Sequence, residues 1–106
     1  MWPAGDGPRF SILQGHEVVP VADCLEWAQW FETAADRQVA YDEVYGLRIS
    51  TVFVGTYPLP PTKKVFETMV FPPDSSRELA VDRYETWDEA EAGHAAMLQR
   101  VLDGKV

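Results

Sequence analysis

Apolar residues gather in two stretches that have the composition of β-strands. Leu47–Val54 is β-branched or aromatic at five of its eight positions and is followed by Gly55. Lys64–Phe71 is equally rich in such residues and is followed by Pro72 and Pro73, which cannot continue a central strand. Nine residues separate the two stretches, so we predict that they pair as antiparallel neighbours.

Two other segments show the 3.6-residue periodicity of amphipathic helices, and each opens with a capping signal. Asp23–Ala35 begins with Asp-x-x-Glu and carries a wide, aromatic apolar stripe. Thr86–Leu102 begins with Thr-x-x-Glu, and its apolar seam is interrupted only by His94. We therefore predict helices over both ranges.

Weaker extended patterns complete the list of elements. These are Phe10–Leu13, Glu17–Pro20, Gln38–Val44 and Glu78–Tyr84. The resulting order, β-β-α-β-β-β-β-α, predicts an α+β fold in which two helices pack on an antiparallel sheet of about four to six strands. Two glycines and two prolines in Met1–Arg9 predict a flexible arm at residues 1–9, ahead of a single domain at residues 10–106.

Composition narrows the classes of function. The 106 residues include 17 acidic and 9 basic side chains, a net charge of −8, which argues against direct binding to nucleic acid or anionic lipid. One cysteine and two histidines exclude a disulfide framework and a multi-cysteine zinc site, and we expect neither a metal nor a cofactor. No apolar run reaches the length of about 20 residues that a membrane span needs. We expect a cytoplasmic protein, with Cys24 packed as a small hydrophobe.

The pairing of the two strong strands decides whether a buried polar cluster exists. If Val54 faces Lys64, Thr51 lies opposite Glu67 in the middle of an otherwise apolar face, and His94 approaches from the last helix. A buried carboxylate beside a histidine and a hydroxyl is a group of residues that performs acid–base chemistry. This register makes a small hydrolase the alternative function, with Glu67, His94 and Thr51 as its catalytic residues.

A register shifted by one residue gives the opposite outcome. It moves Glu67 to the other face, where Arg48 is available for a surface ion pair. Even in the first register, a buried Glu–His or Glu–Thr contact is more often structural than catalytic. The chain also lacks a nucleophile elbow, a glycine-rich phosphate loop and zinc-binding spacing. Our leading interpretation is therefore a protein without catalytic residues.

Aromatic and acidic clusters favour binding to another protein. Trp27 and Trp30 cannot both point straight at the core from one helix, so one of them either lies near a dimer or partner interface or serves to cover the small sheet. Asp88, Glu89 and Glu91 begin the last helix, where negative charge suits the helix dipole. Their alternative role is an acidic surface that imitates nucleic-acid phosphates and occupies a basic groove of a partner. We take these five residues as the candidate partner-binding set.

Four blocks of sequence stand out together. They are Val19–Glu32, Val39–Gly55 with V-A-x-x-E-V-x-G-L-R-I-S-T-V-F-V-G, Phe66–Phe71 with F-E-T-M-V-F, and Arg83–Met97 with R-Y-E-T-W-D-E-A-E-A-G-H-A-A-M. These blocks resemble a group of small bacteriophage and prophage proteins without assigned activity. The resemblance covers residues 10–102 and carries over no functional residue. It implies a phage origin and a cytoplasmic setting in a bacterial host.

Together these observations predict a non-enzymatic phage accessory protein that acts by protein–protein binding. The expected partner is a bacterial host protein or a second copy of the chain. The specific form of the hypothesis is inhibition of a host nucleic-acid-handling or defence protein through the acidic surface.

Overall fold

The structure is a computed structural model that describes residues 10–56 and 63–106; the predicted arm at residues 1–9 lies outside them. The predicted α+β fold and its element order are confirmed. The elements are β1 (Phe10–Gln14), β2 (Glu17–Val21), α1 (Cys24–Thr33), β3 (Gln38–Val44), β4 (Leu47–Phe53), β5 (Phe66–Phe71), β6 (Ala80–Tyr84) and α2 (Trp87–Leu102).

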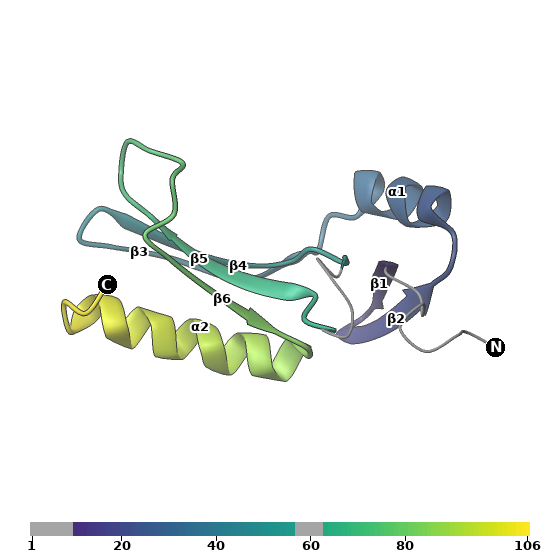
Figure 1. The fold of residues 1–106 in the computed structure, drawn as a ribbon. Coiled ribbons are helices and arrows are strands. Elements are labelled where there is room, and N and C mark those ends of the chain that lie inside the picture. The colour runs from purple at the N-terminus through teal and green to yellow at the C-terminus, as the bar shows by residue number, and fades with distance from the viewer. Residues whose placement is uncertain (1–9, 57–62) are drawn as a thin grey trace.

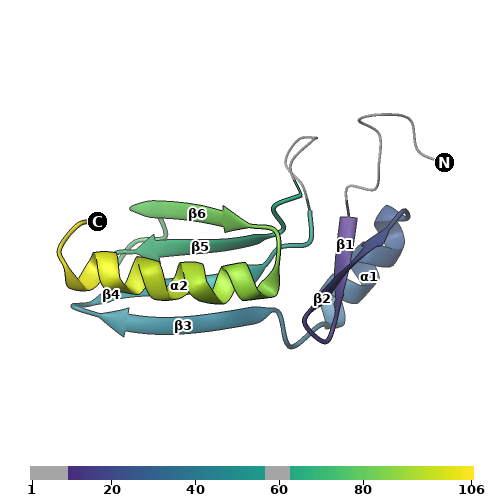
Figure 2. The same ribbon diagram turned by 90° about the horizontal axis from the view of Figure 1, so that it is seen from below.

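The strands form two antiparallel sheets where we had expected one. β3, β4, β5 and β6 make a four-stranded meander, and β1 and β2 make a separate hairpin. Helix α2 covers one face of the meander, while α1 packs on the hairpin at one end of the molecule (Figures 1 and 2). The Ser11 N–H donates to the Gly55 carbonyl at 2.7 Å and so ties the hairpin to the chain that follows β4.

Both helices begin at the predicted capping residues. The Asp23 carboxylate accepts from the Leu25 N–H at 2.9 Å. At the start of α2, Thr86 Oγ1 accepts from the Glu89 N–H at 3.1 Å, and the Glu89 carboxylate accepts from the Thr86 N–H at 3.2 Å. This reciprocal pair satisfies N–H groups that the first turn of a helix leaves without partners.

The register of β4 and β5 differs by one residue from the first register that we considered. Thr51 pairs with Thr68, and Val52 pairs with Glu67. The observed register places Phe66 and Val70 on the α2 side, where neither side chain is exposed to solvent. Burial of these two side chains explains the shift, because the first register would turn both toward the other face.

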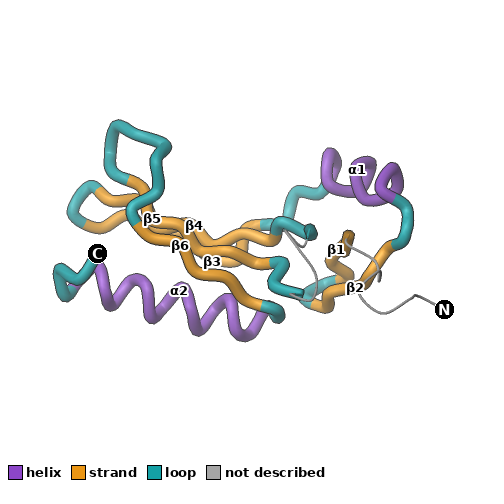
Figure 3. Tube along the Cα trace, in the orientation of Figure 1, coloured by secondary structure: helices purple, strands orange, loops and turns teal. Residues whose placement is uncertain are grey.

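The core beneath α2 consists of two apolar clusters. One contains Leu13, Phe53, Val65, Phe66 and Ala90; the other contains Ile49, Val70, Met97 and Val101. The second cluster lies under the C-terminal half of α2, and the first reaches the hairpin through Leu13. Figure 3 shows α2 running along the meander and α1 beside the hairpin. The α2 residue His94 falls between Ala90 and Met97 in the sequence, so a polar group separates the apolar clusters.

Candidate functional site

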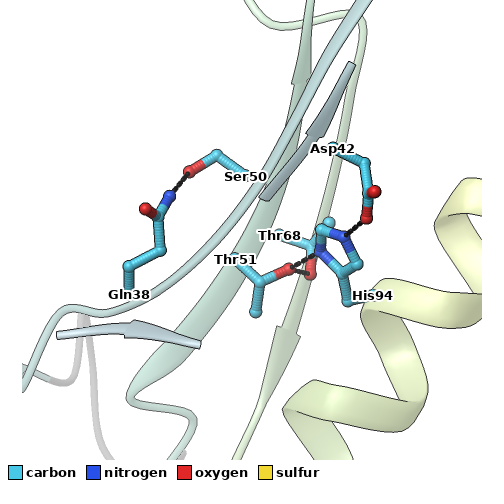
Figure 4. Close-up of polar contacts among 6 residues, drawn as sticks. All are labelled: Gln38, Asp42, Ser50, Thr51, Thr68 and His94. Atoms are coloured by element: carbon cyan, nitrogen blue, oxygen red, sulfur yellow. Dashed lines mark hydrogen bonds and ion pairs between the residues drawn. The ribbon is translucent and has the colours of Figure 1, made fainter. Parts of the chain in front are cut away.

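A chain of polar side chains crosses the sheet beneath α2 (Figure 4). Thr51 Oγ1 lies 2.7 Å from His94 Nδ1 and 2.5 Å from Thr68 Oγ1. His94 Nε2 lies 2.7 Å from Asp42 Oδ2. Thr51 and Thr68 are fully buried and His94 is 4% exposed. Each buried polar atom of this group therefore has a partner, as the low-dielectric interior requires.

Regular periodicities bring these residues together. Asp42 pairs with Ile49 and Ala40 pairs with Thr51, so the alternation of side chains along β3 turns Asp42 toward α2. His94 follows the buried Ala90 by four residues, which places both on the same side of α2. The histidine that interrupts the apolar seam thus faces the sheet between its apolar neighbours.

Asp42, His94 and Thr51 are the residue types of a nucleophilic triad. The carboxylate is exposed and the hydroxyl is buried, however, whereas a nucleophile must be the exposed member. The side chain of Asp42 is 46% exposed, whereas the Thr51 hydroxyl has no access to solvent. A substrate would meet the carboxylate and would not reach the hydroxyl, which must contact substrate to act as a nucleophile. In this arrangement the three side chains link α2 to β3 and β4.

Glu67 does not join this group, so the expected Glu67–His94–Thr51 cluster was wrong in one of its three members. Glu67 points to the opposite face, and its Oε2 lies 3.2 Å from Arg83 Nε. The ion pair expected between Arg48 and Glu67 in the shifted register was also wrong. Its guanidinium donates to the carbonyl oxygens of Pro72 (3.3 Å) and Ser75 (2.7 Å), which fixes the β5–β6 connection.

Both helix tryptophans are partly buried by their own neighbours. The Trp30 ring packs edge-on against Phe53, with centroids 5.7 Å apart. The Trp27 ring lies 5.2 Å from Phe10 and 4.9 Å from Phe31. Trp30 therefore contributes to the core of the protein, and Trp27 to an aromatic group on the hairpin side. Cys24, expected to be packed, is exposed at the first residue of α1.

The acidic residues at the start of α2 do not all have the same role. Asp88, Glu89 and Glu91 are all exposed. The Glu89 carboxylate also accepts from the N–H groups of Glu85 and Thr86, at 3.1 and 3.2 Å. Asp88 and Glu91 are therefore the two better candidates for contact with a partner, because changing Glu89 also removes a helix cap.

The face of the meander opposite α2, which we call the open face, has no covering helix or strand among the described residues (Figure 1). A row of side chains crosses its middle: Tyr41, Ser50, Met69 and Val81. Tyr41 and Val81, at the two edges, are 46% and 39% exposed. Sequence reasoning missed this row, because it became visible only with the correct register.

Four charged residues of the open face form two cross-strand pairs, each with one acidic and one basic residue. Glu43 pairs with Arg48 across β3 and β4, and Glu67 pairs with Arg83 across β5 and β6. Their formal charges sum to zero, although the chain as a whole carries −8. The open face is thus a neutral, partly apolar area on an acidic protein.

Two tyrosines have shifted acidity. The Tyr41 hydroxyl donates to Glu43 at 2.7 Å, and this hydrogen bond raises the pKa of Tyr41. Burial raises the pKa of Tyr84, and the neighbouring Thr68 hydroxyl opposes that rise. Tyr84 lies in register with Phe66 on the α2 side of the sheet, where its ring packs over Gly93.

Neither helix within residues 10–56 and 63–106 has the length and apolar character needed to span a bilayer. The same part of the chain holds no group of three or more His, Cys, Asp or Glu side chains placed to bind a metal ion. Comparison with protein-family models, curated proteins and solved structures finds no match to this chain.

Proposed function

We propose that this chain is a non-enzymatic accessory protein that binds a basic partner protein through its open face, while its acidic surface, including the start of α2, attracts that partner. The open face carries the proposal. An antiparallel sheet with one helix-covered face normally exposes polar residues on the other, yet Tyr41, Met69 and Val81 lie there in one row. Removing such a row from water favours association.

The charge distribution supports a basic partner. The open face is neutral, so an approaching protein meets no net charge at the contact itself. The rest of the chain carries the net charge of −8, which attracts a positively charged surface and accelerates its encounter. Proteins that handle nucleic acid present such surfaces. Together with the resemblance to phage proteins, the charge distribution favours a host nucleic-acid-handling or defence protein as the partner, and binding would inhibit that partner.

Site-specific photo-cross-linking in a bacterial lysate tests the surface. A photoreactive residue at Met69 should yield one discrete cross-linked partner, and the same residue at Ala96, on the exposed side of α2, is the matched control. The captured protein should be basic. When Tyr41→Arg is added to the chain that carries the photoreactive residue, the yield should fall about tenfold, because a charge replaces an apolar contact within the interface. Equal capture from both positions, or capture of an acidic protein, would contradict the proposal.

The acidic surface is tested separately. Asp88→Lys with Glu91→Lys should weaken capture of the same partner, and added salt should weaken capture by the unmodified chain. Glu89 is left unchanged because it caps α2. Capture that resists both changes would remove the electrostatic part of the proposal. If sedimentation shows a dimer that Met69→Arg converts to a monomer, the partner at the open face is a second copy of the chain and not a host protein.

The alternative function, a small hydrolase, now depends on Asp42, His94 and Thr51. The complete burial of Thr51 weighs against it. His94→Ala distinguishes the two functions in a folded chain, which circular dichroism verifies. This variant should still capture the partner if the protein is a binding module. Hydrolysis that His94→Ala abolishes would instead establish the enzyme.

A further inference from the structure

A small hollow lies where α1 ends and the chain turns toward β3. It is lined by Leu13 and Gly15 of the hairpin, by Trp30 of α1, and by Ala34, Ala35 and Asp36, which follow α1. Its volume is about 210 Å³, which is below the range of about 300 to 1,000 Å³ that is typical of small-molecule sites. A space of this size suits a single side chain of a partner protein.

The C-terminal end of α1 favours a positive charge beside this hollow. The aligned backbone dipoles of a helix place its negative end there, and the last turn of α1 contains no basic residue. Arg37 is the first basic residue after the helix. Its guanidinium lies 3.8 Å from the centre of the Phe31 ring, and it is not among the residues that line the hollow. The hollow itself therefore remains open to a cation from another molecule.

Two side chains of the lining suit a guanidinium group. Asp36 is exposed, and its carboxylate has no hydrogen-bond or ion-pair partner among residues 10–56 and 63–106. Trp30 is only partly buried, and its contact with Phe53 holds the ring in place. A guanidinium can stack on an indole ring and donate to a carboxylate at the same time. The ammonium group of lysine has no planar face and is more strongly hydrated, so arginine is the better match.

The hollow borders the open face. Asp36 precedes Gln38, the first residue of β3, by two positions, which span at most about 7 Å. The Gln38 amide donates to Ser50 Oγ at 3.2 Å, and Ser50 belongs to the row that crosses the open face. Helix α1 also stands on the open-face side of the meander (Figure 1). A partner that covers the row can thus reach the hollow with a side chain at the border of the contact.

We infer that this hollow receives an arginine side chain of the basic partner, an inference that rests on the proposed function. Trp30 stacks on the guanidinium, Asp36 pairs with it, and the end of α1 adds the attraction of its dipole. The apolar row supplies the main contact area, and the hollow makes the contact selective for a basic protein. Trp30 then serves the core and the partner together.

A small probe tests the hollow without the partner. The amide of Nα-acetyl-arginine should shift the NMR signal of the Trp30 indole N–H at millimolar concentrations, and a Trp30→Phe chain identifies that signal. The amide of Nα-acetyl-citrulline, which has nearly the same shape and no charge, should leave it unmoved. Asp36→Asn should raise the dissociation constant of the arginine probe about fivefold, the effect of one partly exposed charge pair.

Glu32→Gln is the matched control, because it removes the same charge from an exposed residue on the opposite side of α1 from Trp30. It should change the dissociation constant less than about twofold. Equal losses from Glu32→Gln and Asp36→Asn would overturn the inference, since net charge alone would then explain binding. Equal shifts from the arginine and citrulline probes would overturn it too. Equal binding of the amide of Nα-acetyl-lysine would overturn the assignment to arginine.

The contact with the partner is tested in the chain that carries the photoreactive residue at Met69. Asp36→Asn should reduce capture about fivefold, and Glu32→Gln should reduce it less than about twofold. Probe binding with no capture from Met69 would overturn the proposed function. Capture from Met69 that Asp36→Asn leaves unchanged would overturn only the arginine contact, so the two failures are distinguishable.

Discussion

The two faces of the meander are built from the same strands, but they are stabilised differently. On the α2 side, Phe53, Phe66 and Val70 have no exposure to solvent. On the open face, Met69 and Phe71 alternate with those residues along β5 and are only partly buried. Neighbouring residues of one strand therefore differ because a helix covers one face only. Burial, more than β-propensity, determines how much each side chain contributes to the stability of the fold.

Polar residues follow the same division. Beneath α2, Thr51 and His94 bond to other protein groups and take part in a continuous chain. On the open face, Glu67 and Arg83 form an ion pair in which the arginine side chain is 46% exposed. Hydrogen bonds are stronger in a low-dielectric interior, and surface charges are screened by water and salt. Matched substitutions on the two faces measure this difference.

The largest difference is expected for two phenylalanines at the ends of β5. Phe66→Ala should lower the free energy of unfolding by about 4 kcal/mol, because it leaves a cavity in a fully buried site. Phe71→Ala should lower it by about 1 kcal/mol, since that ring is partly exposed and its main specific contact is with Arg48, 5.2 Å from the ring centre. Urea unfolding of both variants gives the two values. Equal losses would show that the open face is covered in solution.

The packing of β6 on α2 is probed at Gly93. A Cβ atom there would lie 2.1 to 2.3 Å from the ring and hydroxyl atoms of Tyr84. Gly93→Ala should therefore destabilise the protein by about 2 to 3 kcal/mol, even though alanine favours a helix by about 1 kcal/mol over glycine.

Two further variants control this prediction. Ala92→Gly, on the exposed side of the same helix, should lose about 1 kcal/mol from helix propensity alone. Tyr84→Ala should make Gly93→Ala harmless in the double variant, because the clash then has no partner. A stabilising effect of Gly93→Ala in the unmodified chain would show that Tyr84 does not pack on the helix.

Adjacent residues of β4 provide a polar comparison. Thr51→Val should lower the free energy of unfolding by about 2 kcal/mol, because it leaves His94 Nδ1 buried without a partner. Ser50→Ala on the open face removes only the hydrogen bond from Gln38, at 3.2 Å, and should lower it by about 0.5 kcal/mol. Thermal or urea unfolding at neutral pH compares them. A larger loss for Ser50→Ala would reverse the assignment of the two faces.

Local patterns predicted the elements well because each depends on a few neighbouring residues. The expected strand Leu47–Val54 is observed as Leu47–Phe53, and the expected helix Thr86–Leu102 is observed as Trp87–Leu102 with Thr86 as its cap. The capping signal was decisive, since it combines a side chain and a backbone group three residues apart. The division of the strands into two sheets was not predictable, because it depends on contacts between distant segments.

The register was ambiguous for a physical reason. Both faces of Lys64–Phe71 carry apolar side chains: Phe66 and Val70 on one, Met69 and Phe71 on the other. Alternation alone cannot then say which face is buried. The sequence analysis correctly predicted that His94 lies beside Thr51, but it named Glu67 as the carboxylate of the cluster. In the structure that carboxylate is Asp42. Asp42 was overlooked because β3 has little apolar contrast between its faces.

The smallest effect is expected for the ion pair of the open face. Arg83→Gln should lower the free energy of unfolding by about 0.5 kcal/mol, because the pair is half exposed and surface ion pairs contribute little. Its contribution should vanish in about 1 M salt, where the screening length is about 3 Å. Asp42→Asn, which weakens the partner of His94, should give a loss of about 1 kcal/mol that persists in salt, because the imidazole end of that contact is buried. If salt removes both losses equally, the two contacts share one environment, and the contrast between the covered and the open face does not extend to their charged residues.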